Sequence, residues 1–267
     1  MEQKLIKKIE KKLIHIWIKI HEKKYFYKDK TIKYVLLDNN SDFLCVCFAG
    51  FPALGTYPVY NYIRTLIGLK KMNYLFILDD MVNIPTGGGY YLGNMGNYWG
   101  IEAVPEMIFN LKDKLSAKKL ITVGSSKGGS CALFYGAKIG ADYIIAGACQ
   151  YRIGTYLNCP YHIMSLRELT GEKDTLKEVS NEAISYLDNL IFQALKENQT
   201  IKNTKIWLHY SNREHTFFSD IKFLIEDLEK LGYNFSEDIK GYENHGDVGL
   251  YFPSYIKKIL RNLEAEH

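Results

Sequence analysis

The chain has 267 residues, 47% of them hydrophobic, and its 34 basic and 30 acidic side chains leave a formal charge of +4. A chain of this length and hydrophobic content buries one sizeable core, so a single domain is expected. The basic residues are spread along the sequence instead of forming a stripe, which argues against nucleic-acid binding.

The five cysteines include no CxxC pair, and most lie in apolar strand-like runs, so neither disulfides nor structural zinc is expected. No run of about 18 apolar residues is present. The N-terminus lacks an apolar segment with a small-residue cleavage site. We therefore expect a cytoplasmic protein without a bound metal or other tightly held cofactor.

Residues 1–24 are rich in Lys and Ile, with apolar side chains at helical spacing. Such a basic amphipathic helix packs on its own domain or lies on an anionic membrane face, and the first alternative is favoured. The rest of the chain, 25–267, is interpreted as one domain. It opens with a hairpin, in which residues 25–27 and 32–37 flank a Lys-Asp-Lys turn.

From Asp42 onward, strands and helices alternate. Further strands are expected at 43–48, 74–78, 120–123, 143–146, 205–210 and 235–242, and helices at 59–69, 101–115, 127–139, 217–231 and 250–263. The segment 149–204, with a helical stretch at 176–195, is interpreted as a lid-like insertion after the sixth strand. This order predicts an α/β fold with a mostly parallel sheet flanked by helices, and a ligand site at the carboxyl ends of the strands.

A buried strand, a Gly/Ser turn and a small-residue helix follow one another at residues 120–133. In Gly124-Ser125-Ser126-Lys127-Gly128 the glycines lie two residues before and two after Ser126, as a strained strand-to-helix turn requires. Ser126 is the candidate nucleophile, and the N–H of Lys127 is placed to donate to an oxyanion. A phosphate-binding helix start or a plain turn is the alternative.

A serine nucleophile needs a histidine base and a carboxylate to orient it, both from loops after later strands. His245 is the candidate base because it lies in a polar loop between the last strand and the terminal helix. Glu214 is the candidate acid, with Asp220 as its competitor. His215 is the less favoured base because it precedes the final strand.

The second oxyanion donor is expected in the loop after strand 43–48. Gly50 lets the backbone turn toward the substrate, and Phe51 supplies the N–H because the following Pro52 has none.

A glycine-rich loop at 86–100 borders the same edge and lacks the GK[ST] ending of a P-loop. Its aromatic residues, Tyr90, Tyr91, Tyr98 and Trp99, suit a platform for a sugar ring or adenine, or they pack the loop itself.

The elbow Gly124–Gly129, the stretch Ser211–Glu214 and the pair His245-Gly246 resemble those of α/β-hydrolases, from about Tyr25 to the end of the chain. Together with Gly89–Gly93, the elbow is also similar to bacterial surface-polysaccharide O-acetyltransferases and to hydrolase-like proteins of accessory secretion systems. The resemblance implies transfer of acetyl from acetyl-CoA to a sugar hydroxyl. The sequence departs from these families in two ways: the acid is Glu214, where Asp is commoner, and the HGGG-type oxyanion loop of many esterases is missing.

Three functions follow, in order of preference. The first is a serine acyltransferase that acts on a polysaccharide hydroxyl, and the second is an esterase that uses the same Ser126, His245 and Glu214. The third is a non-catalytic module that binds a glycan or a protein. A cation at Lys127 is compatible with a coenzyme A donor.

Overall fold

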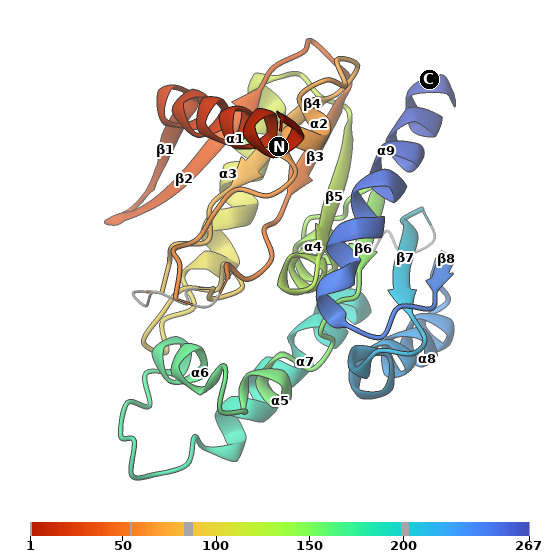
Figure 1. The fold of residues 1–267 in the computed structure, drawn as a ribbon. Coiled ribbons are helices and arrows are strands. Elements are labelled where there is room, and N and C mark those ends of the chain that lie inside the picture. The colour runs from red at the N-terminus through yellow and green to blue at the C-terminus, as the bar shows by residue number, and fades with distance from the viewer. Residues whose placement is uncertain (1, 54, 83–87, 199–202, 267) are drawn as a thin grey trace.

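The structure, a computed structural model, describes residues 2–53, 55–82, 88–198 and 203–266, with side chains from residue 12 onward. One sheet of eight strands, in the order β1-β2-β4-β3-β5-β6-β7-β8, forms its centre (Figure 1). β2 runs antiparallel to both of its neighbours, β1 and β4. The six strands β3 to β8 are parallel to one another. This confirms the predicted α/β fold. The strands are β1 Glu22–Tyr27, β2 Lys30–Leu37, β3 Phe43–Cys47, β4 Asn73–Ile77, β5 Lys119–Ser125, β6 Tyr143–Gly147, β7 Lys205–Ser211 and β8 Asn234–Lys240.

Helices cover both faces of the sheet, because alternate residues of its inner strands are apolar on each side. In β3, Leu44 and Val46 join the core under α3, α4, α7 and α8, whereas Cys45 and Cys47 join the core under α1, α2 and α9. In Figure 1, α9 crosses in front of the sheet. The helices are α1 Glu2–His21, α2 Ile63–Leu66, α3 Gly100–Lys114, α4 Lys127–Lys138, α5 Ile153–Leu157, α6 Ile163–Thr170, α7 Asn181–Glu197, α8 Lys222–Leu231 and α9 Val248–Glu266.

The segment predicted as an insertion divides into two parts. α7 begins at its N-cap Ser180, and its buried Leu187 and Ile191 belong to the same core as α4. It is therefore the helix that connects β6 to β7 over the sheet. α5 and α6 lie below the sheet in Figure 1, beside the loop that follows β3.

Two predicted helices have different bounds. α1 ends at His21, because residues 22–24 pair with β2 in the hairpin. The predicted helix at 59–69 is wrong, since only the single turn α2 forms, after Tyr62 at a positive φ of 65°. Side chains 1–11 of the predicted N-terminal helix and residues 86–87 of the predicted glycine-rich loop lie outside the described parts.

The described half of α1 carries apolar side chains both toward the core and on its exposed side. Trp17 packs against the core, and Ile16 and Ile20 on the same helix are exposed. Within the described residues, no helix has both the length and the apolar character needed to span a membrane. Contact of α1 with a membrane surface stays a prediction.

Candidate active site

Ser126 lies at the sharp turn between β5 and α4. Its backbone, with φ 54° and ψ −128°, is in a region that residues other than glycine rarely adopt. A Cβ at Gly124 would lie 2.1 Å from the carbonyl oxygen of Gly128, and a Cβ at Gly128 would lie 2.4 Å from that of Phe48. The turn therefore requires both glycines, as the sequence pattern predicts.

The structure brings together the three residues of the predicted triad. The Nε2 of His245 lies 2.8 Å from the Oγ of Ser126. The Nδ1 of His245 lies 3.2 and 3.3 Å from the carboxylate oxygens of Glu214. Glu214 comes from the loop after β7, and His245 begins the 3₁₀ turn His245–Asp247 that leads into α9.

Glu214 is held as an anion although its side chain is fully buried. Burial alone would raise the pKa of this carboxyl, but hydrogen bonds with His245 and Thr216 outweigh it and hold the pKa below its ordinary value. Thr216 donates to Glu214 through both its hydroxyl and its backbone N–H. A buried negative charge therefore faces the imidazole of His245.

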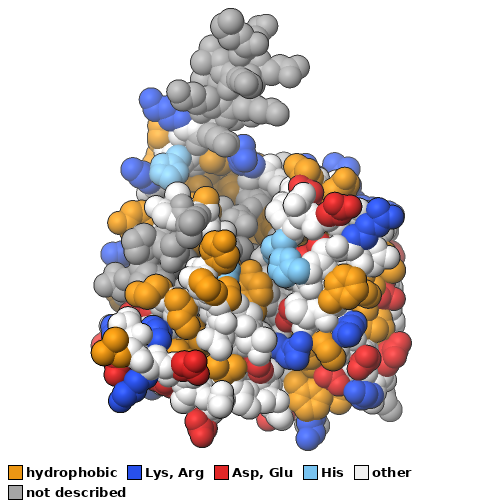
Figure 2. Space-filling model, turned by 60° about the horizontal axis from the view of Figure 1, so that its bottom comes forward, with side chains coloured by type: hydrophobic (Ala, Val, Ile, Leu, Met, Phe, Trp, Pro, Cys, Tyr) orange, Lys and Arg blue, Asp and Glu red, His pale blue; other side chains and the backbone are white. Residues whose placement is uncertain are grey.

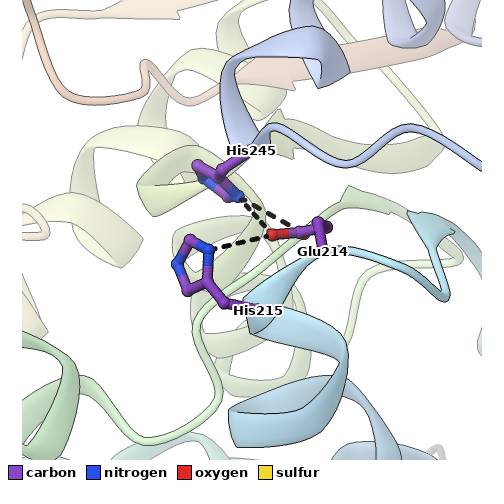
Figure 3. Close-up of side chains that lie close together, drawn as sticks. All are labelled: Glu214, His215 and His245. Atoms are coloured by element: carbon purple, nitrogen blue, oxygen red, sulfur yellow. Dashed lines mark hydrogen bonds and ion pairs between the residues drawn. The ribbon is translucent and has the colours of Figure 1, made fainter.

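Two histidines share this carboxylate, as Figure 3 shows. The Nδ1 of His215, whose side chain is largely exposed, lies 3.4 Å from Glu214. Glu214, His215 and His245 are also the one group in the described part of the chain whose donor atoms are close enough together to hold a metal ion. A metal bound through the Nδ1 of His245 would displace the hydrogen bond between this nitrogen and Glu214.

Asp220, the competing acid, is engaged elsewhere. It lies in the π-helical turn Phe217–Ile221 before α8 and accepts hydrogen bonds from the backbone N–H groups of Tyr151 and Arg152 at 2.7 and 2.9 Å. Burial raises its pKa. Its described contacts do not include His245, so the geometry favours Glu214 as the partner of the imidazole.

Gln150 is a site residue that the sequence analysis missed. It is fully buried in the loop after β6, and its Nε2 donates to the Oγ of Ser126 at 3.0 Å. The hydroxyls of Tyr90 and Ser130 each donate to its Oε1 at 3.3 Å. The available signal was one amide side chain directly after an apolar strand, at the carboxyl edge of the sheet.

The predicted oxyanion residues lie beside one another. A Cβ at Gly50 would lie 3.5 Å from the carbonyl oxygen of Ser125, so the loop after β3 passes directly by the elbow. A Cβ at Gly88 would contact both the ring of Phe51 and the side chain of Lys127. The N–H of Lys127 is in the first turn of α4, where helical N–H groups lack an intrahelical acceptor.

The sequence leaves open whether the side chain of Lys127 contacts a donor phosphate, and in the structure this side chain is buried. It is 1% exposed and forms a buried ion pair with Asp79, which follows β4. Its ammonium also lies 4.8 Å from the ring centre of Tyr91. The ion pair links the first turn of α4 to the loop after β4, across the intervening strand β3.

The rings of Phe51, Tyr156 and His162 form a stack, which we call the aromatic wall. Phe51 and His162 have ring centres 4.8 Å apart, and Tyr156 of α5 stacks on His162 at 5.0 Å. Burial, together with the proximity of His245, lowers the pKa of His162 and favours its neutral form. In Figure 2, which brings this end of the molecule forward, histidine and hydrophobic side chains lie close together at the surface.

The predicted aromatic platform is wrong for Tyr90 and Tyr91. Both rings are buried in the core, and the hydroxyl of Tyr91 donates to the carbonyl of Ile77 at 3.0 Å. Tyr98 instead stacks on Tyr186 of α7. Tyr98, Tyr186 and Trp99 all line a surface hollow near the β1–β2 turn. These residues therefore do not form one face toward Ser126.

No protein-family model matches the sequence, and no curated protein matches it. Among solved structures, the capsule O-acetyltransferase of Neisseria meningitidis serogroup A superposes with a TM-score of 0.73 at 17% identity, over 89% of this chain and 94% of that one. The chain has the α/β-hydrolase fold.

Two other structures share it. The glycosylation-associated Gap123 complex of Streptococcus agalactiae gives a TM-score of 0.72 at 18% identity, over 91% of this chain and 47% of that one. The fluorophosphonate-binding serine hydrolase FphF of Staphylococcus aureus gives 0.57 at 12%, over 91% and 97%. At these identities the likeness establishes the fold, and the activity must be argued from the site.

Proposed function

We propose that the protein is a serine acyltransferase that moves an acetyl group from acetyl-CoA to a hydroxyl of a bacterial surface polysaccharide. The observation that carries the proposal is the 2.8 Å contact between His245 Nε2 and Ser126 Oγ, with Glu214 at the other ring nitrogen. A nucleophile, a base and an orienting acid within hydrogen-bond reach are what covalent acyl transfer requires.

Hydrogen-bond accounting gives the resting protonation pattern. An amide nitrogen only donates, so Ser126 Oγ accepts from Gln150 and its own proton is directed to His245 Nε2. The Nδ1–H of His245 then donates to the Glu214 carboxylate. This tautomer is the one a general base needs.

In the first step, Ser126 Oγ attacks the thioester carbonyl carbon while His245 takes its proton. The N–H groups of Lys127 and Phe51 stabilise the oxyanion. The C–S bond breaks, the thiolate leaves with the proton from His245, and an acetyl ester remains on Ser126.

In the second step, a sugar hydroxyl gives its proton to His245 and attacks this ester. The C–O bond to Ser126 breaks, and the serine takes the proton back.

Transfer and hydrolysis differ only in the acceptor. Two observations support transfer: the TM-score to the capsule O-acetyltransferase is 0.73 against 0.57 for the serine hydrolase, and a variant of that acetyltransferase has been solved with CoA. The aromatic wall also places apolar surface beside the elbow, which disfavours water as the acceptor. The assembled contacts to Ser126 speak against a non-catalytic binding module.

The test is the release of free CoA from acetyl-CoA, with and without a panel of bacterial surface polysaccharides. Release that increases with a polysaccharide, together with an acetylated sugar product, is expected. Equal release with and without acceptor, with acetate as the only product, would instead establish a hydrolase. The Ser126→Ala variant is the control for both activities.

A further inference from the structure

A hollow of about 530 Å³ opens beside Ser125 of the elbow, and its lining contains none of the residues of the aromatic wall. It lies between α1, the segment around α2, and α9, and it reaches Ser125, the residue next to the nucleophile. The hydroxyl of Tyr62, which also lines it, bonds to the Oγ of Ser125 at 2.5 Å. The hollow is therefore joined to the site by one residue of the chain.

The two charged side chains in the lining of this hollow are both basic, and Glu22, outside the lining, accepts a hydrogen bond from the lining residue Tyr60 at 2.8 Å. Its lining includes Arg64 and Lys257 and no carboxylate. Within the described side chains, neither cation forms an ion pair, whereas Lys33, Lys119 and Lys127 each have an acidic partner. Unpaired cations in a concave wall concentrate positive potential, and a guanidinium matches the geometry of phosphate oxygens.

Lys257 is set apart from the reacting atoms along α9. α9 begins directly after the turn that carries His245, and Lys257 lies nine residues after Val248, which is roughly 14 Å along a helix. Much of the remaining lining is apolar or neutral, including Ile18, Val59 and Pro253. A ligand that fits carries negative charge at one end and a longer neutral arm that leads toward Ser126.

We propose that this hollow binds the phosphate-bearing end of the acyl donor, with Arg64 and Lys257 on the phosphate oxygens and the thioester arm directed to Ser126. The inference deepens the proposed function and rests on it. It assigns donor recognition to the α2–α9 side of the elbow, which leaves the aromatic wall for the acceptor.

The test compares two donors that carry the same thioester, acetyl-CoA and S-acetylpantetheine, which lacks phosphates. Acylation of Ser126 is followed by intact mass in the wild type, Arg64→Ala and Lys257→Ala. Lys258→Ala is the matched control, since its exposed side chain is on the same helix outside the hollow. Each cation variant is expected to raise the half-saturating acetyl-CoA concentration roughly tenfold, the effect of one charge-assisted hydrogen bond.

The maximal rate, the acetylpantetheine reaction and the Lys258→Ala variant are expected to stay unchanged. An unchanged half-saturating concentration in both cation variants would overturn the proposal, and so would an equal loss with both donors.

Binding of adenosine 3′,5′-bisphosphate, measured by calorimetry, separates this inference from the proposed function. Binding to the wild type that is lost in Arg64→Ala supports the phosphate site even if no acyl-enzyme forms. Acylation by acetyl-CoA without any such binding would sustain the proposed function and refute this site.

Discussion

Replacing Glu214 with Gln removes the buried negative charge that faces His245 and keeps the size of the side chain. The amide can also place its NH₂ group against Nδ1, which leaves the proton on Nε2, opposite Ser126. Both changes weaken the base. Asp220→Asn is the matched comparison, because this carboxylate is equally buried and holds the start of α5.

The size of the effect follows from the geometry. A carboxylate oxygen 3.2 Å from the Nδ1 of His245 stabilises an imidazolium by about 5 kcal/mol at an effective dielectric constant of about 20. Since about 1.4 kcal/mol corresponds to a factor of ten, Glu214→Gln is expected to slow acylation by roughly 10³- to 10⁴-fold. Asp220→Asn is expected to remain within about tenfold of the wild type, because it loses hydrogen-bond strength worth about 1 kcal/mol.

The assay is the rate at which a fluorophosphonate probe labels Ser126, with the acetyl-CoA reaction followed in parallel. Circular dichroism checks that both variants are folded. If Asp220→Asn lost as much as predicted for Glu214→Gln, and Glu214→Gln stayed near wild type, the assignment of the acid would be wrong.

The same substitution has a pH signature in stability. The folded-state pKa of Glu214 is held below its ordinary value, so its ionised form stabilises the fold above that value and the contribution is lost as pH falls through the folded pKa. The difference in free energy of unfolding between wild type and Glu214→Gln should therefore shrink in acid, below about pH 4.5. A difference that grew with acidity in urea titrations would contradict this sign.

Three further substitutions test other parts of the site. Gln150→Met keeps the side-chain volume and removes the hydrogen-bond donor to Ser126, so acylation of Ser126 in the first turnover should slow roughly tenfold. An unchanged acylation rate would show that this hydrogen bond does not assist the nucleophile. Gly124→Ala should prevent folding, since its Cβ would lie 2.1 Å from a carbonyl oxygen, whereas Gly246→Ala, in open space, should leave the melting temperature unchanged. Asp79→Asn leaves the buried Lys127 ammonium without a counter-ion and should cost about 3–5 kcal/mol in urea unfolding, and an unaltered midpoint would contradict the buried pair.

Local patterns were sufficient to predict much of the fold. Apolar runs separated by amphipathic helices predicted the parallel strands, and glycines two residues either side of Ser126 predicted the elbow. His245 and Glu214 were chosen because loops after late parallel strands meet at one sheet edge. This inference requires only the order of strands and loops along the chain.

The errors come from features that depend on tertiary contacts. Aromatic residues in a glycine-rich loop suit a ligand platform or a core equally well, and only packing under β3 and β4 buried Tyr91. The direction of the Lys127 side chain was left open by the sequence, because it depends on Asp79, which is distant in sequence. Gln150 is a single polar residue after an apolar run, and this alone does not identify it as a site residue.

The central claim is that Ser126 becomes an acyl-enzyme, and the intact mass of the protein after mixing with acetyl-CoA tests it most directly. The wild type should gain the mass of one acetyl group, and the Ser126→Ala variant should gain none. An acetyl gain in both proteins, or no gain in a wild type that a fluorophosphonate still labels at Ser126, would contradict the proposed acyl transfer from acetyl-CoA.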